Sequence, residues 1–99
     1  PIKSPTYAVV EPHQAPDGLA IAHFDFYRFA DPREWEDAGL RDAFAAPGLK
    51  LAEWPEHAAP LLPAADLDVH LQVDADEQRL VHLVAGTRVG EQLLQDLRA

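Results

Sequence analysis

Short apolar runs separated by proline, glycine and aspartate predict a series of strands along this chain. The expected strands cover residues 7–11, 19–27, 49–54, 67–73 and 79–85. Pro12 limits the first strand, and the turn Pro16-Asp17-Gly18 makes the second return antiparallel to it. Every second residue of 67–73 is apolar, which predicts a half-buried strand that forms a hairpin with 79–85.

Capping residues predict where the helices begin and end. Asp31 can cap a helix, and Glu34 stands where a capping-box partner belongs. Gly39 is a suitable end for this helix, and residues 40–46 add a short second one. Thr87 can cap a last helix. The apolar face of that last helix comprises Val89, Leu93, Leu94 and Leu97.

Polar and aromatic residues alternate at the end of the second expected strand. His23, Asp25 and Tyr27 share one face of an extended chain, whereas Phe24 and Phe26 point the other way, into a core. A carboxylate at the end of an apolar strand is where α/β proteins place an acid that handles a metal or a phosphate. Asp25 is therefore the first candidate for a functional residue.

Glu53 is the second candidate acid, because it also ends a strand whose earlier residues are apolar. If the two strands are neighbours in the sheet, the carboxylates of Asp25 and Glu53 converge. Two such oxygen ligands suit Mg²⁺, or one acid holds the metal while the other positions or activates a water. The alternative is that both are ordinary solvated carboxylates at strand ends.

Several other residues carry weaker signals. Thr6 offers a hydroxyl to a metal or phosphate from a rigid loop, or is a turn residue. His23 is an acceptor, a proton shuttle or, as the default, a hydrogen-bonded structural histidine. Arg28 and Arg79 have forked donors that suit phosphate or carboxylate. Core packing is the default for Trp54, as it is for any tryptophan.

The last hairpin places His70 and His82 on its two arms, where they face one another. Two histidines without a third ligand are weak support for zinc, so we interpret them as surface residues. The only serine, Ser4, lies outside any G-x-S-x-G turn, which disfavours a serine hydrolase.

Composition narrows the class of protein. The chain has 99 residues, no internal repeat and no long linker, which predicts a single α/β domain over residues 1–99. Its formal net charge of -9 disfavours direct nucleic-acid binding. It has no cysteine, and no apolar run approaches the roughly 20 residues of a membrane span, so we expect a cytoplasmic location and no membrane partner. It begins with Pro1 rather than Met, which suggests a fragment or a processed product.

Four motifs occur in order along the chain. They are Lys3-Ser4-Pro5-Thr6-Tyr7, His23-Phe24-Asp25-Phe26-Tyr27-Arg28, Gly39-Leu40-Arg41-Asp42 and Glu53-Trp54-Pro55. Together they resemble the TsaE (YjeE) family, the small bacterial P-loop ATPases of tRNA threonylcarbamoyladenosine biosynthesis. The resemblance runs from Lys3 to the last helix.

The resemblance implies a role for each matching residue. Asp25 matches the Walker B aspartate, and Glu53 matches an acid tied to Mg²⁺ and ATP hydrolysis. Thr6 matches the threonine of a switch-like loop near the γ-phosphate. Trp54 matches a tryptophan beside the nucleotide, and Arg79 falls near a position that contacts nucleotide. ATP and Mg²⁺ are the implied cofactors, with Asp25 and Glu53 as the metal ligands.

The sequence departs from the family in one large respect, because it contains no G-x-x-x-x-G-K-[ST] loop. It resembles the C-terminal portion of a family member: a truncated P-loop NTPase-like mixed sheet with flanking helices, two antiparallel hairpins and the strands carrying Asp25 and Glu53. We therefore expect the chain alone to be inactive as an ATPase.

The implied function is an ATP-binding and ATP-hydrolysing subunit for tRNA N6-threonylcarbamoyladenosine modification. Its implied partners are the other subunits of the threonylcarbamoyl-transferase complex. One alternative is a non-catalytic protein-interaction module of the same assembly. Another is a metal-dependent phosphohydrolase built on Asp25 and Glu53, which is disfavoured because the sequence shows no further metal ligand.

Overall fold

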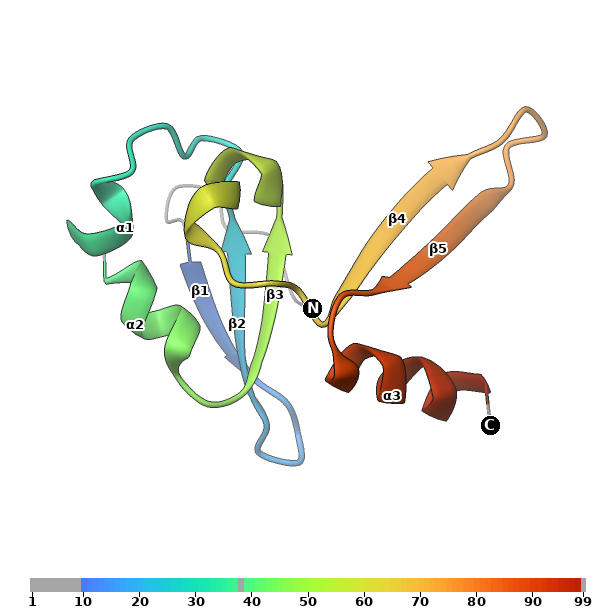
Figure 1. The fold of residues 1–99 in the computed structure, drawn as a ribbon, viewed down its shortest axis with the longest axis horizontal. Helices are drawn as coiled ribbons and strands as arrows, with labels where there is room; N and C mark the ends of the chain where they lie inside the picture. The colour runs from blue at the N-terminus through green and yellow to red at the C-terminus, as the bar shows by residue number, and fades with distance from the viewer. Residues whose placement is uncertain (1–9, 38, 99) are drawn as a thin grey trace. The chain divides into compact units, whose positions relative to one another are not determined.

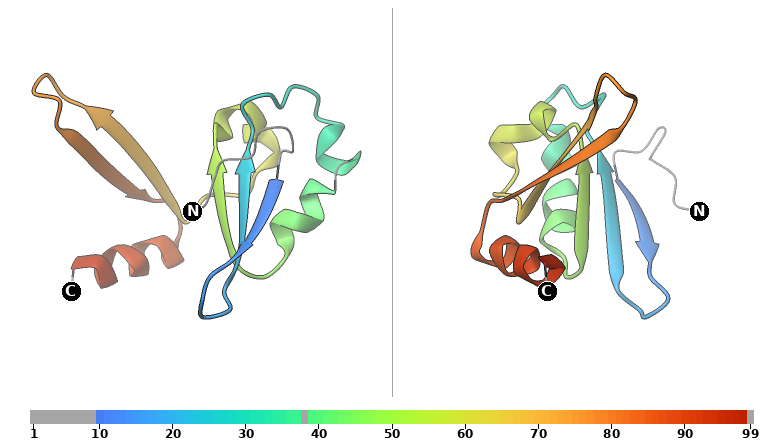
Figure 2. Two further views of the ribbon diagram at one scale, coloured as in Figure 1. Left: turned by 180° about the vertical axis from the view of Figure 1, so that it is seen from behind. Right: turned by 90° about the vertical axis from the view of Figure 1, so that its right-hand side faces the viewer.

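The computed structural model describes residues 10–37 and 39–98 (Figures 1 and 2). Its contacts divide the chain into two units, Pro1–Leu62 and Pro63–Ala99, each described by itself below. The expectation of one domain over residues 1–99 stays a prediction. No helix in the described part of the chain combines the length and the apolar character needed to cross a membrane.

The first unit is built on a mixed sheet with the strand order β1-β2-β3. β1 (Val10–Gln14) pairs antiparallel with β2 (Ala20–Asp25), as the turn signal predicts. β2 pairs parallel with β3 (Leu49–Glu53) (Figure 1). The register sets Asp25 directly opposite Glu53. The parallel pair therefore ends in two acidic residues at the same edge of the sheet.

β1 differs from the expected first strand. Pro12 lies inside it, opposite Ala22 of β2, so the prediction that Pro12 limits the strand is wrong. Within the described residues β1 is an edge strand, and an edge strand tolerates a residue without a backbone N–H. Residues 7–9 of the expected strand lie outside the described part of the chain.

The described part of the first unit also contains three short helices: α1 (Glu34–Asp37), α2 (Leu40–Ala45) and the 3₁₀ helix η1 (Pro55–Leu61). They pack with β2 around a core of apolar side chains, in which Phe24, Phe26 and Leu40 are fully buried. Trp35, Phe29 and Ala58 complete its buried set. The predicted alternation is confirmed, because Phe24 of β2 and Phe26, which directly follows the strand, are both in the core.

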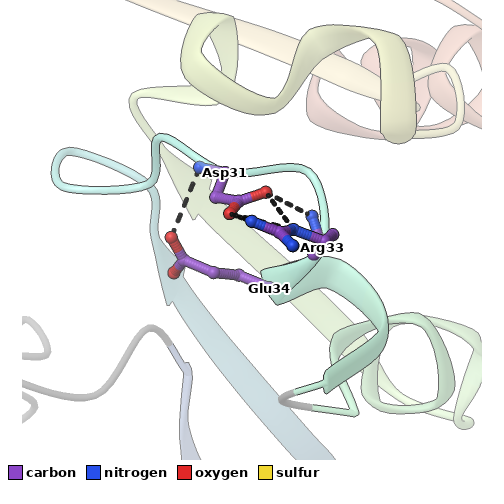
Figure 3. Close-up of polar contacts among 3 residues, drawn as sticks. All are labelled: Asp31, Arg33 and Glu34. Atoms are coloured by element: carbon purple, nitrogen blue, oxygen red, sulfur yellow. Dashed lines mark hydrogen bonds and ion pairs between the residues drawn. The ribbon is translucent and has the colours of Figure 1, made fainter.

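The capping box predicted at the start of α1 is present in the structure (Figure 3). The backbone N–H of Arg33 donates to Oδ1 of Asp31 over 2.9 Å, and the backbone N–H of Asp31 donates to Oε1 of Glu34 over 3.4 Å. The Arg33 guanidinium also pairs with Oδ2 of Asp31 at 3.0 Å. The side-chain hydrogen bond from Arg33 is the larger cause that lowers the pKa of Asp31 below its ordinary value. The backbone hydrogen bond from Arg33 is the second cause.

We expect Asp31→Ala to lower the melting temperature, because the backbone N–H of Arg33 loses its side-chain acceptor at the start of α1. Asp31→Asn is the matched control, since asparagine caps a helix but carries no charge for Arg33. Folding lowers the pKa of Asp31, so its charge stabilises the fold above the ordinary value of 3.8. That contribution is lost as the pH falls through the lower, folded-state pKa. Thermal melts of the three proteins at about pH 7 and about pH 2.5 check this. The difference in melting temperature between the parent and Asp31→Asn should shrink in acid, and a constant difference would contradict the charge effect.

The second unit contains a hairpin and a helix. β4 (Leu67–Val73) pairs antiparallel with β5 (Arg79–Ala85), and α3 (Arg88–Arg98) follows. The predicted cap of α3 is confirmed, because Oγ1 of Thr87 accepts the backbone N–H of Gly90 at 3.1 Å. The two strands of the hairpin thus form where the sequence predicts them, and so does the last helix.

The hairpin is more exposed than the alternation predicts. Leu71 is 74% exposed and Val73 67%, so the prediction of a half-buried β4 is wrong. The described residues offer this strand one partner, β5, and α3 packs against β5. The rings of His70 and His82 face one another at 6.1 Å, as predicted, and both side chains are exposed.

Candidate functional site

The carboxyl ends of β2 and β3 place the two candidate acids together. Asp25 and Glu53 are register partners in the parallel pair, and directly opposite residues of neighbouring strands share one face of the sheet. The pairing continues one step further, because the backbone N–H of Phe26 donates to the carbonyl oxygen of Glu53 at 3.0 Å. The condition that the two strands be neighbours is therefore met.

Asp25 is held by the turn that follows its own strand. Its Oδ1 accepts the backbone N–H of Tyr27 at 3.0 Å. Such a bond to the residue two positions later is typical of aspartate where a regular element ends. The side chain is half-buried, so the local backbone fixes its orientation while part of it stays accessible.

Glu53 is held by a histidine from the neighbouring strand. Nε2 of His23 lies 2.7 Å from Oε1 of Glu53, and the side chain of His23 is 9% exposed against 45% for Glu53. The default expectation of a hydrogen-bonded His23 is thus confirmed. The sequence did not identify its partner, because the partner comes from a strand 30 residues away.

Trp54 is not a core residue. It is 50% exposed and has φ of 54°, a left-handed conformation that ends β3 directly after Glu53. The expectation of core packing is wrong because the strand ends before this residue. Instead, its ring lies 5.1 Å from that of Tyr27 and 5.5 Å from that of His57.

His57 is the residue of this region that sequence reasoning missed. Its Nδ1 lies 2.9 Å from the carbonyl oxygens of both Phe26 and Tyr27, so η1 is tied to the segment after β2. The three rings of Tyr27, Trp54 and His57 lie close to one another, and we call them the aromatic cluster. Each of its members follows one of the two acids within four residues.

The remaining candidates lie elsewhere or outside the structure. Thr6 is outside the described residues. Arg79 is the first residue of β5 in the second unit and is exposed, and Arg28 is exposed after β2. Among the described residues, no three histidine, aspartate or glutamate side chains gather in a metal-binding group. Asp25 and Glu53 are the pair that fits Mg²⁺, which usually takes one or two carboxylates and completes its shell with water and phosphate.

These features define a class of protein. A mixed sheet with helices packed on it, and with acids at the carboxyl ends of parallel strands, is a mixed α/β fold with a candidate site at that edge. Residues 1–81 match the family described as "Threonylcarbamoyl adenosine biosynthesis protein TsaE". The chain belongs to the TsaE family, as its motifs predict.

Individual relatives agree with this assignment. Over 93 residues the chain is 41% identical to the tRNA threonylcarbamoyladenosine biosynthesis protein TsaE of Haemophilus influenzae, covering 94% of this chain and 58% of that protein. Over 78 residues it is 31% identical to the protein of the same name from Treponema pallidum, covering 79% and 56%. The chain thus spans less than two thirds of the length of these curated relatives.

The fold also has a counterpart among solved structures. The structure described as "Crystal structure of Bacillus subtilus YdiB" superimposes with a TM-score of 0.71 at 23% identity. The match covers 98% of this chain and 60% of that one. The mixed α/β architecture predicted from the sequence is therefore confirmed.

Proposed function

We propose that this chain carries the acidic part of an ATP-hydrolysing site that supports tRNA N6-threonylcarbamoyladenosine modification. The observation behind the proposal is the register of β2 and β3, which sets Asp25 opposite Glu53 at the carboxyl ends of parallel strands. Its biological setting comes from the relatives, which are named as threonylcarbamoyladenosine biosynthesis proteins.

In this proposal the two acids share the metal, and Glu53 has a second task. Asp25 is the Walker B aspartate and, with Glu53, would hold Mg²⁺, which neutralises charge on the phosphates. Glu53 positions or activates the attacking water, a task for a carboxylate that is partly open to solvent and aimed by its surroundings. The tie between Asp25 and the Tyr27 backbone keeps the first acid in place during this step.

The nucleotide would be contacted from the loops around these acids. Trp54 presents a half-exposed ring beside Tyr27, and an exposed aromatic face suits stacking on a base. Thr6 and Arg79 are the other proposed nucleotide contacts. We also propose a cytoplasmic protein whose partners are the other subunits of the threonylcarbamoyl-transferase complex. Those partners would hold the tRNA, because a net charge of -9 repels it.

Steady-state phosphate release with Mg²⁺–ATP tests the proposal in two proteins. The first is the 99-residue chain by itself, the isolated chain. The second is the same chain preceded by a segment that carries the P-loop, the restored chain. The sequence contains no G-x-x-x-x-G-K-[ST] loop to cradle phosphates, so we expect turnover by the restored chain and none by the isolated chain. Mg²⁺-dependent turnover by the isolated chain that Asp25→Ala abolishes would contradict this expectation.

A second candidate function is a non-catalytic interaction module of the same assembly. The exposed apolar side chains of the hairpin favour it, including Leu71, Val73 and Val81. The DNA upstream of the codon for Pro1 separates the two candidates. An in-frame G-x-x-x-x-G-K-[ST] supports the ATPase, and a start site at Pro1 supports the interaction module.

A further inference from the structure

His23 stands out as a buried polar residue beside the candidate site. Its relative exposure is 7%, and it lies on the face of β2 that also carries Asp25. Its Nε2 lies 2.7 Å from Oε1 of Glu53, whereas its Nδ1 is buried with no hydrogen-bond partner in the described part of the chain. Among the described residues, one nitrogen of this ring therefore has a hydrogen-bond partner and the other has none.

The hydrogen bond to Glu53, rather than the unpartnered nitrogen, points to a role for His23 beyond packing. A buried polar atom without a partner destabilises a fold, and an apolar side chain of similar shape would fill the same space without that loss. What histidine adds here is one N–H. A carboxylate only accepts hydrogen bonds, so Nε2 carries a hydrogen in this contact, and in the neutral ring Nδ1 then keeps a lone pair.

We propose that His23 is a positioning residue for Glu53, an inference that rests on the proposed ATPase function. Glu53 ends its strand, is half-exposed and has three rotatable side-chain bonds, so its carboxylate needs a fixed partner to point one way. The imidazole comes from the neighbouring strand and is packed, which makes it a rigid partner. Nε2 of His23 thereby aims the carboxylate that positions or activates the water.

Two amide variants test this role in the restored chain. The amide nitrogen of glutamine has about the reach of Nε2, and that of asparagine has about the reach of Nδ1, which has no partner. We expect His23→Asn to lower kcat about 10- to 100-fold with little change in KM for Mg²⁺–ATP, the usual loss for residues that orient functional ligands. His23→Gln should recover most of kcat.

The matched control is His13→Asn. The His13 ring lies 6.5 Å from that of His23, on the neighbouring strand β1, and its Nε2 is likewise buried without a partner in the described part of the chain. We expect this variant to keep the kcat of the parent. Thermal melts of all variants establish that each is folded at the assay temperature.

The outcomes separate this inference from the proposed function. An inactive restored parent overturns the proposed function and the inference with it. An active parent whose kcat is unchanged by His23→Asn, or lowered equally by the two amide variants, overturns the inference and leaves the proposed function standing.

If the position-23 variants do not fold, side-chain ¹⁵N spectra of the parent decide instead. They should show His23 as the Nε2–H tautomer, with an Nε2 resonance that shifts in Glu53→Ala. An Nδ1–H tautomer, or an Nε2 resonance that does not respond, overturns the inference.

Discussion

Replacing Glu53 with glutamine should slow ATP hydrolysis by the restored chain about 10²- to 10⁴-fold, the usual contribution of a positioned acid or base. The substitution keeps the size of the side chain and an oxygen that can still accept the Nε2–H of His23. It removes the negative charge and the ability to take a proton. Packing should change little, so the loss should appear in kcat while the melting temperature stays near that of the parent.

Glu36→Gln is the matched control for this experiment. Glu36 is an exposed acid on α1 that pairs with Arg41. The same charge change there should leave kcat unaltered. If Glu53→Gln hydrolysed ATP at the rate of the parent, the proposed role of Glu53 would be wrong, even though its place opposite Asp25 would stand.

The sequence predicts best what depends on neighbours along the chain. The capping box at Asp31, the cap at Thr87 and the turn before β2 all form as expected, because their partners lie within a few residues. The alternation in β2 also assigns Phe24 and Phe26 to the core. A period of two is a geometric property of any strand, whatever the rest of the fold.

The sequence predicts less where a partner is distant. The sequence does not predict that β2 pairs with β3, and the bond from His23 to Glu53 depends on this pairing entirely. Periodicity shows which face a residue occupies, but not which strand lies next to it. The same limit hid His57, whose contacts to Phe26 and Tyr27 span about 30 residues of chain.

Two wrong expectations have a common physical origin. The expectations that Trp54 packs in the core and that Leu71 is half-buried rest on one assumption. Both assume that another part of the fold covers every apolar side chain. Trp54 turns out of the strand through a left-handed backbone, and Leu71 belongs to a hairpin whose described partners are β5 and α3. Apolar character predicts a preference for burial, whereas actual burial depends on how many elements surround the residue.

Replacing Phe26 with alanine should destabilise the first unit by about 3–5 kcal/mol, the range observed for buried aromatic residues. Phe26 is fully buried, and its ring lies 5.6 Å from that of Phe29 and 6.4 Å from that of Trp35. Removing it leaves a cavity where three segments meet, directly after the strand that carries Asp25.

Tyr27→Ala is the matched control for the core substitution, because it removes an aromatic ring one position later from a side chain that is 57% exposed. We expect it to destabilise the fold by less than about 1 kcal/mol, since exposed positions contribute little to packing. Urea unfolding followed by circular dichroism compares the midpoints of the two variants with that of the parent. Equal shifts for both variants would contradict the alternation that sends Phe26 inward and Tyr27 outward. A much larger shift for Phe26→Ala would mean that the core behind β2 holds the edge of the sheet at which Asp25 and Glu53 meet.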